Sequence, residues 1–267
     1  MILEPAPAKL NLALHVRRRR ADGYHDIETL FAFVTDGDEL RVATGVARFA
    51  ISGPFALALA GEGSNLVLKA ERAFAKEFGI DAAHRIELVK RLPIASGIGG
   101  GSADAAATLR ALARLHGVAI DDPRLFALAD TLGSDVPACL LGHTAIGLGR
   151  GEQLRPVAGP GHLPVLLVNP GVPVSTADVF RRWDGVDRGP IGDDPLAGRN
   201  DLEAPAREIA PVIGDVLDWL RAQPGASFVR MSGSGATCFA LFDSVEARAA
   251  AARAMHRGWW HLETMLA

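Results

Sequence analysis

The sequence of 267 residues has no long hydrophobic run, and no stretch approaches the roughly 18 apolar residues that a membrane-spanning helix needs. Its two cysteines, Cys139 and Cys238, lie in apolar stretches, which predicts buried thiols rather than a disulfide. The N-terminus does not resemble a signal peptide. The formal net charge of -3 gives no general attraction to nucleic acid or anionic lipid. These absences favour a cytoplasmic protein that has neither nucleic acid nor membrane as a partner.

Lysine and tyrosine are also scarce. Only four of the 28 basic residues are lysines, and Tyr24 is the single tyrosine. Because a compact ammonium and a flat guanidinium are not interchangeable, each lysine raises the question of whether an ammonium is required there. Chance remains the alternative explanation for any one of them.

The composition, with 49% hydrophobic and 22% charged residues, is that of a globular chain with ample material for a core. The length allows one large or two small domains. Proline, glycine and alanine gather around residues 156–164, which is typical of a domain boundary. We therefore expect domains at residues 1–158 and 159–267.

Hydrophobic periodicity predicts the elements of the first domain. Strands are expected at residues 8–16, 26–34, 39–44, 47–52 and 85–92. Helices are expected at 64–78 with Ser64 as N-cap, at 102–116, and from 123 to 133, while 136–141 fits a helix or a strand and 144–154 a hairpin. On the first strand, Lys9 and Asn11 point to the same face.

In the second domain we expect strands at 165–168, 228–231, 237–242 and 259–265. Helices are expected from 175, at 211–222 and at 244–255, with a loose polar loop at 184–200. This β–α–β–β–α–β-like order suggests a ferredoxin-like sandwich.

One segment combines a strand end, four glycines and a helix start. It consists of Pro93, Ile94, Ala95, Ser96, Gly97, Ile98, Gly99, Gly100, Gly101, Ser102 and Ala103. Glycines let a backbone approach a ligand, N–H groups of such a turn can form an anion nest, and the helix adds its positive end. The segment predicts a loop that holds the phosphates of a nucleoside triphosphate. A flexible surface loop is the alternative.

Two commoner phosphate motifs are excluded. The chain contains no Gly-Lys pair, so it has no Walker loop. Ser102 stands where a Rossmann fingerprint needs its third glycine, and the loop follows several strands without alternating helices.

Three motifs in this order resemble those of the GHMP kinases (galacto-, homoserine, mevalonate and phosphomevalonate kinases). Residues 7–12 (Pro-Ala-Lys-Leu-Asn-Leu), the glycine loop and residues 232–236 (Ser-Gly-Ser-Gly-Ala) are similar to the first, second and third family motifs. The resemblance implies a two-domain α+β fold. Its N-terminal domain would be ribosomal protein S5 domain 2-like and its C-terminal domain ferredoxin-like, with ATP and Mg²⁺ as cofactors.

Further segments are similar to one branch of this family. They are residues 20–25 (Arg-Ala-Asp-Gly-Tyr-His), 90–93 (Lys-Arg-Leu-Pro), 133–137 (Gly-Ser-Asp-Val-Pro) and 169–171 (Asn-Pro-Gly). This resemblance implies phosphorylation of the 2-hydroxyl of 4-diphosphocytidyl-2-C-methyl-D-erythritol, a step in non-mevalonate isoprenoid biosynthesis. The partner would be this small molecule, and we expect a monomer or a weak homodimer.

The resemblance also assigns catalytic roles. Asp135 becomes the base that takes the alcohol proton, and Lys9 the cation that keeps Asp135 ionised and stabilises the transferring phosphoryl group. From the residues alone, Asp135 is equally a helix N-cap, and Lys9 is better explained as a solvated strand lysine.

Binding roles follow in the same way. Tyr24 and His25 suit a clamp for the cytosine, although packing of the turn is the simpler explanation without the resemblance. Asn11, Thr176, Gly233 and Ser234 are assigned to the rest of the substrate, and Asn65 and Lys90 to the adenine.

One position departs from the family pattern. Ala103 stands where relatives often carry a second serine, which removes a hydroxyl for Mg²⁺ or phosphate, and no carboxylate is marked out for the metal. Two other functions stay open. A homoserine- or mevalonate-type kinase is disfavoured by Tyr24 and His25, and a nucleotide-binding regulator without turnover by Lys9 and Asp135.

Overall fold

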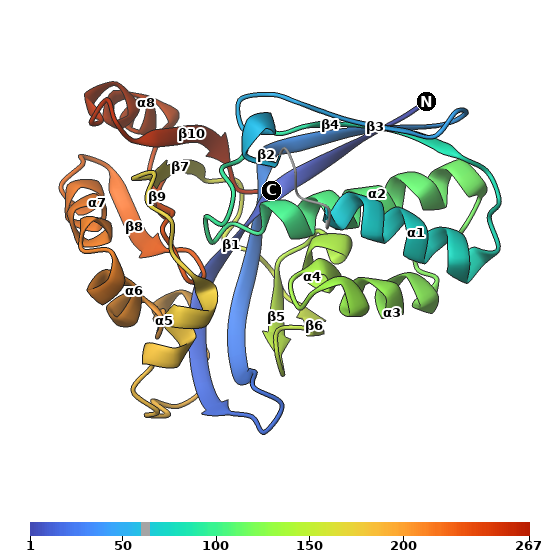
Figure 1. Cartoon of the computed structure of the whole chain (residues 1–267). Coiled ribbons are helices and arrows are strands. Elements are labelled where there is room, and N and C mark those ends of the chain that lie inside the picture. Colours follow the sequence, from blue (N-terminus) through green and yellow to red (C-terminus); the bar gives the residue numbers. More distant parts are fainter. Residues whose placement is uncertain (60–64) are drawn as a thin grey trace. The chain divides into compact units, whose positions relative to one another are not determined.

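A computed structural model of the chain describes residues 1–59 and 65–267 (Figure 1). These residues form two compact units. Unit 1 comprises Met1–Ala8, Asp36–Ile94 and Gly99–Gly142, and unit 2 comprises Lys9–Thr35, Ala95–Ile98 and His143–Ala267. The expected division between residues 158 and 159 stays a prediction, and in this grouping residues 9–35, 95–98 and 143–158 of the expected first domain belong to unit 2. None of the described helices is long and apolar enough to cross a membrane.

The two long strands are β1 (Ile2–Arg19) and β2 (His25–Thr44), which pair with each other. The sequence predicted a shorter first strand and a break between residues 34 and 39. The break is absent because Gly37 and Asp38 both fit inside β2. A Cβ at Gly37 would lie 2.0 Å from the carbonyl oxygen of Ala6, and Asp38 is buried with charged and N–H partners described below.

Unit 1 places helices beside a small sheet. In the sheet, β4 (His84–Val89) pairs in parallel with β3 (Arg48–Ser52) and antiparallel with residues 39–44 of β2. The helices are η1 (Ala56–Leu59), α1 (Leu66–Phe78), α2 (Gly100–His116), α3 (Pro123–Leu132) and α4 (Val136–Leu141). Figure 1 shows α1, α2 and α3 packed together, and the alanine-rich α2 is the most buried of them.

Caps explain where these helices begin and end. Asn65 caps α1, since its Oδ1 accepts a hydrogen bond of 2.9 Å from the N–H of Val67. The predicted cap Ser64 lies outside the described residues. The predicted ends of α1 and α2 at Gly79 and Gly117 are confirmed, and both glycines have a positive φ.

Unit 2 contains the turn end of the β1–β2 hairpin and the predicted hairpin β5 (Ala145–Leu148) and β6 (Gln153–Pro156). Residues 29–31 of β2 pair antiparallel with β5. The predicted alternation along residues 8–16 is present, but both faces are covered, since all nine residues are buried.

The second sheet of unit 2 has the order β10–β7–β9–β8, all antiparallel between neighbours. Its strands are β7 (Pro164–Asn169), β8 (Ala226–Met231), β9 (Cys238–Phe242) and β10 (Trp260–Met265), and its helices include α5 (Thr176–Arg182), α7 (Val212–Arg221) and α8 (Val245–Ala254). This strand order matches the predicted ferredoxin-like sandwich. A core of buried hydrophobic residues from α7, β7 and β9 holds it together.

The segment 184–200, predicted to be a loose loop, is instead bound to β1. Leu14 N–H donates to the carbonyl of Arg199 at 2.8 Å, and Asp201 N–H donates to the carbonyl of Leu14 at 2.8 Å. His15 donates from Nδ1 to the Gly189 carbonyl and accepts at Nε2 from Arg199 N–H. The sequence analysis also missed η2 (Pro195–Ala197) and α6 (Glu203–Ile209), which are short.

Candidate active site

The predicted site residues are distributed over both units. Unit 2 holds Lys9, Asn11, Tyr24, His25, Thr176, Gly233, Ser234 and residues 95–98, while unit 1 holds Asn65, Lys90, Asp135 and residues 93–94 and 99–103. The two sets are described in turn.

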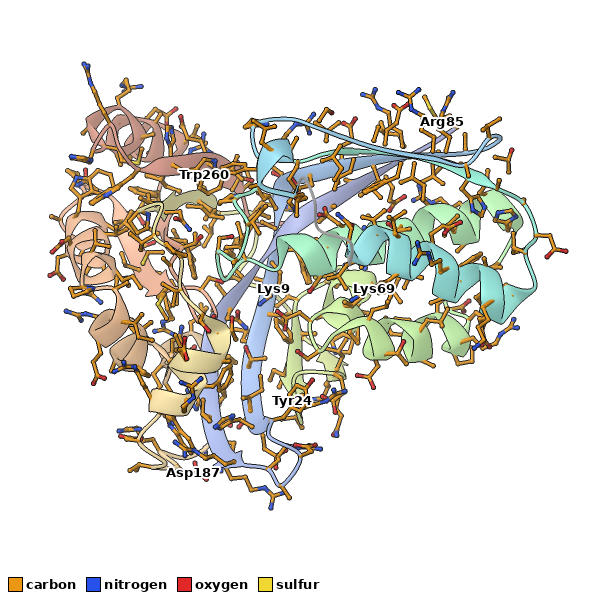
Figure 2. All side chains as sticks on the ribbon, viewed as in Figure 1. Lys9, Tyr24, Lys69, Arg85, Asp187 and Trp260 are labelled. Carbon is orange, nitrogen blue, oxygen red and sulfur yellow. The ribbon has the colours of Figure 1, made fainter. Side chains whose placement is uncertain are left out.

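Lys9 and Asn11 meet on one face of β1, as the alternation predicted. Lys9 Nζ donates to Asn11 Oδ1 at 2.9 Å, and it also lies 5.4 Å from the centre of the Phe31 ring. Asn11 Nδ2 donates to Thr29 Oγ1 at 2.8 Å. Lys9 is only 3% exposed, so the alternative of a solvated strand lysine is wrong. Figure 2 shows Lys9 midway along β1, well away from the turn that carries Tyr24.

Residues 95–98 of the glycine loop lie between β1 and the third motif. Lys9 N–H donates to the Ile98 carbonyl at 2.9 Å, and Thr237 N–H donates to the Ser96 carbonyl at 3.1 Å. Ser232 joins all three motifs, since its Oγ donates to the Gly97 carbonyl and accepts from Asn11 N–H. The three motifs are therefore adjacent in space.

Gly97 is required by this packing. Its φ is +79°, and a Cβ there would lie 2.4 Å from the Ser232 carbonyl oxygen. At least one of the four glycines thus makes room for the protein's own chain, whereas the sequence analysis attributed all four to a ligand. Ala95 also has a positive φ of 49°, which is uncommon for a residue with a Cβ.

Two predicted substrate contacts are neighbours. The hydroxyls of Thr176 and Ser234 are 2.9 Å apart. Asn200 supports this loop, because its Nδ2 donates to the carbonyls of Met231 and Gly233, each at 2.8 Å. This pair, with Thr176 at the start of α5 and Ser234 on the loop supported by Asn200, is suited to polar groups of a small substrate.

Tyr24 and His25 lie at the turn end of the β1–β2 hairpin. Tyr24 is 51% exposed, while His25 is half-buried against Phe180 of α5, with ring centres 4.9 Å apart. Trp183 meets His25 edge-on at 5.8 Å. Within the described residues, the buried His25 Nε2 and Trp183 Nε1 make no hydrogen bond. The result is an aromatic group with unused polar atoms.

Electrostatics favours a neutral His25. Burial, helped by the positive charge of Arg19, lowers the pKa of the imidazole below its ordinary value. A neutral ring has one nitrogen that donates and one that accepts. Arg150 lies over the Tyr24 ring with its guanidinium carbon 5.2 Å from the centre, so the tyrosine is held from one side.

In unit 1, the glycine loop leads into the N-terminus of α2. Gly99 is the N-cap residue with a φ of 65°, so the chain turns sharply there before Gly100. The first N–H groups of a helix have no partner inside it, and with the helix dipole they favour an anion. No bulky side chain follows, since residues 101–103 are Gly, Ser and Ala. A polyphosphate fits this helix end.

Lys90 is buried beside that helix rather than exposed to a ligand. Its Nζ lies 2.6 Å from Asp38 Oδ2 and 2.6 Å from Asp104 Oδ2, and it is 2% exposed. A Cβ on Gly100 would come within 3.1 Å of Nζ. Lys90 N–H donates to Ser52, and its carbonyl accepts from Phe55 N–H. The ammonium expected near the adenine is thus engaged with two carboxylates.

The buried triad of Lys90, Asp38 and Asp104 fixes the residues that lead into the glycine loop. Asp38 Oδ1 also accepts from the N–H groups of Arg91 and Leu92, the residues that precede the glycine loop. Burial raises the pKa of Asp104 to about 7, against the opposing effect of Lys90. Burial also opposes the charge of Lys90, but the two carboxylates prevail and its pKa is raised. Lys90 therefore offsets only part of the effect of burial on the pKa of Asp104.

Asp135 and Asn65 complete the predicted set in unit 1. Asp135 precedes α4 in the N-cap position, but its side chain makes no capping hydrogen bond to that helix. The alternative of a capping aspartate is therefore not supported. Asn65 does cap α1 with its side chain, which commits the Oδ1 atom to Val67.

Some residues were missed by sequence reasoning. Thr29, Asp38 and Phe180 each contact a predicted residue, but they come from other strands and helices. None of the three had a sequence signal, because Asp38 fell in the expected break between residues 34 and 39. Among residues 1–59 and 65–267, no three His, Cys, Asp or Glu side chains gather in a way that could hold a metal ion.

Family models match both parts of the chain. The model described as the GHMP kinases N terminal domain matches residues 65–143, and the one described as GHMP kinases C terminal matches residues 193–260. A crystal structure of 4-(cytidine 5'-diphospho)-2C-methyl-D-erythritol kinase is 38% identical with a TM-score of 0.86, and the match covers 99% of both chains. A homoserine kinase from Cytophaga hutchinsonii, 20% identical with a TM-score of 0.71, shares the fold.

Curated relatives are closer in sequence. A protein of Rhizorhabdus wittichii named 4-diphosphocytidyl-2-C-methyl-D-erythritol kinase is 58% identical, over 98% of this chain and 94% of the relative. A protein of the same name from Novosphingobium aromaticivorans is 50% identical, over 97% of this chain and 90% of that protein. With three family motifs adjacent in space and this similarity along its whole length, the chain belongs to the GHMP kinase family.

Proposed function

We propose that the chain transfers the γ-phosphoryl group of ATP to the 2-hydroxyl of 4-diphosphocytidyl-2-C-methyl-D-erythritol. The substrate is that named by the relatives with 50% and 58% identity. The observation that carries the proposal is the aromatic group around His25, because it separates a cytidine-bearing substrate from homoserine or mevalonate.

The aromatic group suits a nucleobase in two respects. Tyr24 offers an exposed ring face on which a base can stack, and Phe180 offers a second ring next to His25. The neutral His25 can offer one ring nitrogen to the polar edge of cytosine, as a donor or as an acceptor according to its tautomer. A substrate without a base has no use for these groups.

The phosphoryl donor belongs at the α2 N-terminus. Its N–H groups and dipole hold the phosphates, and Gly99 to Gly101 keep side chains out of their way. Mg²⁺ would accompany ATP and neutralise charge on the phosphates. Mg²⁺ that accompanies a nucleotide is bound through the phosphates, water and one or two carboxylates, so it needs no dedicated group of three protein ligands.

Phosphoryl transfer then needs a proton acceptor and a cation. Asp135, which does not serve as a helix cap, takes the proton from the 2-hydroxyl. Lys9 stabilises the charge on the transferring group, and Asn11 holds the Lys9 ammonium. Thr176 and Ser234 bind the sugar-like part of the substrate through their hydroxyls.

A coupled ADP-release assay tests the proposal with purified protein. Turnover is expected with the cytidylated substrate, and little with the uncytidylated sugar phosphate, homoserine or mevalonate. Tyr24→Ala should raise KM for the cytidylated substrate and leave KM for ATP unchanged. Efficient turnover of homoserine or mevalonate contradicts the proposal. ATP binding without ADP release on any of these alcohols identifies a nucleotide-binding regulator instead.

A further inference from the structure

The hydrogen bonds behind Lys9 form a chain with a fixed direction. Thr29 Oγ1 lies 2.6 Å from the Ala13 carbonyl oxygen. A carbonyl only accepts, so the single proton of the Thr29 hydroxyl is donated to Ala13. Towards Asn11, the Thr29 oxygen can then act only as an acceptor.

That constraint determines the orientation of the Asn11 amide. The Asn11 atom that faces Thr29 at 2.8 Å must be the donor Nδ2, and Oδ1 therefore faces Lys9 at 2.9 Å. An ammonium has donors only, so it needs that oxygen. A flipped amide would set NH₂ against the ammonium and leave the Thr29 lone pair facing an oxygen.

All three side chains are shielded from water. Thr29 is 0%, Asn11 2% and Lys9 3% exposed, so water does not readily replace a lost partner. Buried networks of this kind specify one arrangement when every member is satisfied. The Asn11 backbone is fixed as well, because its N–H donates to Ser232 Oγ.

We propose that Thr29 is a positioning residue for phosphoryl transfer, which acts by setting the Asn11 amide so that its oxygen holds the Lys9 ammonium. This role rests on the proposed function of Lys9. Thr29 touches neither the phosphates nor the alcohol in this scheme. It acts through Asn11 and determines where one of the ammonium protons points.

Thr29→Val removes the hydroxyl and keeps the shape of the side chain, while Thr29→Ser keeps the hydroxyl. We expect Thr29→Val to lower kcat about 10-fold, the effect of losing the Asn11 hydrogen bond to the charged Lys9 ammonium, with both KM values unchanged within about twofold. Thr29→Ser should retain most of kcat. Thr108→Val is the matched control, because Thr108 is equally buried and donates to a backbone carbonyl on α2 at 2.8 Å.

A double-mutant cycle separates positioning from general destabilisation. If Thr29 acts through Asn11, Thr29→Val should have almost no further effect on kcat in an Asn11→Ala background. An additive loss in the double variant, or an equal loss in Thr108→Val, overturns the proposal.

A spectroscopic measurement keeps this result independent of the substrate. The chain has four lysines, so ¹⁵N spectra of the side-chain ammonium groups contain few signals, and Lys9→Arg assigns that of Lys9. The Lys9 signal should shift in Thr29→Val and stay in place in Thr29→Ser. A wild-type protein inactive on the cytidylated substrate contradicts the proposed function alone, whereas an unmoved Lys9 signal in Thr29→Val overturns the role of Thr29.

Discussion

Two of the four lysines are buried, and they differ in what surrounds the ammonium. In unit 1, Lys90 Nζ lies 2.6 Å from each of the carboxylates of Asp38 and Asp104. In unit 2, Lys9 Nζ donates to the neutral amide of Asn11 and faces the Phe31 ring. Both are at most 3% exposed, so burial alone does not separate a structural lysine from a functional one.

The difference lies in what each contact accomplishes. The carboxylates around Lys90 come from β2 and α2, so the triad ties the helix N-terminus to the strands behind it. The Asn11 bond to Lys9 uses one of three ammonium protons and orients the rest. We therefore expect loss of Lys90 to affect folding most and loss of Lys9 to affect chemistry most.

Lys90→Met is expected to have the largest effect. It leaves Asp38 and Asp104 buried without their cation, which costs about 3–5 kcal/mol of unfolding free energy in comparable cases. Urea unfolding followed by circular dichroism measures this change. Lys9→Met serves as the paired variant. Compared with Lys90→Met, it should show a smaller decrease in unfolding free energy and a larger decrease in kcat. The comparison fails if the two variants lose the same stability.

Asp135→Asn extends the comparison to the acids of unit 1. Asp38 and Asp104 are buried in the triad, whereas Asp135 is half-buried and is the proposed base. Loss of a general base should lower kcat by at least about 100-fold with little loss of ATP affinity. ADP release and ATP titration measure the two quantities, with the exposed Asp121→Asn as control. Near-normal turnover of Asp135→Asn removes this residue from the mechanism.

The pH dependence of stability tests the triad directly. Burial raises the pKa of Asp104 from 3.8 to about 7, in the presence of Lys90 and Asp38. Because the folded state holds the Asp104 proton more tightly than the unfolded state, protonation of Asp104 adds to the free energy of unfolding. This contribution is complete below pH 4 and is lost as the pH rises through about 7. The slope is at most about 1.4 kcal/mol per pH unit.

Asp104→Asn should reduce the dependence of the unfolding free energy on pH between about 4 and 7. Urea unfolding at pH 5, 6, 7 and 8 measures this dependence. Asp215→Asn, an exposed substitution on α7, should leave the slope unchanged. A wild-type protein with no loss of stability across this range argues against the raised pKa of Asp104.

Local patterns in the sequence predicted much of the fold. Caps at Gly79 and Gly117 and the order of the strands after residue 164 were readable because each depends on neighbouring residues. The continuity of β2 was not readable. From its neighbours alone, Asp38 resembles a loop residue. Its place inside a strand depends on Lys90 and on the N–H groups before the glycine loop, and Lys90 lies 52 positions away in the sequence.

The candidate site divides in the same way. The shared face of Lys9 and Asn11 follows from strand alternation, and the hydrogen bond between them agrees with it. The sequence did not predict a role for Thr29, because threonine is common in strands and the role depends on a partner from another strand. The substrate contacts and the catalytic roles stay predictions, since they depend on molecules that the sequence does not contain.

Arg150, which lies between β5 and β6, provides the smallest and most specific test, at the turn end of the β1–β2 hairpin where Tyr24 lies. Its guanidinium lies over the ring of the single tyrosine, which is 51% exposed and on which the base stacks in the proposed function. Arg150→Met should raise KM for the cytidylated substrate about 2- to 5-fold, the usual strength of an exposed cation–π contact, with kcat unchanged.

Because Tyr24 is the only tyrosine, protein labelled with 3-fluorotyrosine gives one ¹⁹F resonance. That resonance should move when the cytidylated substrate binds, and in the free protein it should move in Arg150→Met but not in the exposed control Arg155→Met. A resonance that ignores the substrate contradicts the stacking role of Tyr24. A resonance that responds to the substrate but not to Arg150→Met keeps Tyr24 as the base platform and removes Arg150 as its support, so the cytidine end would depend on Tyr24, His25 and Phe180 alone.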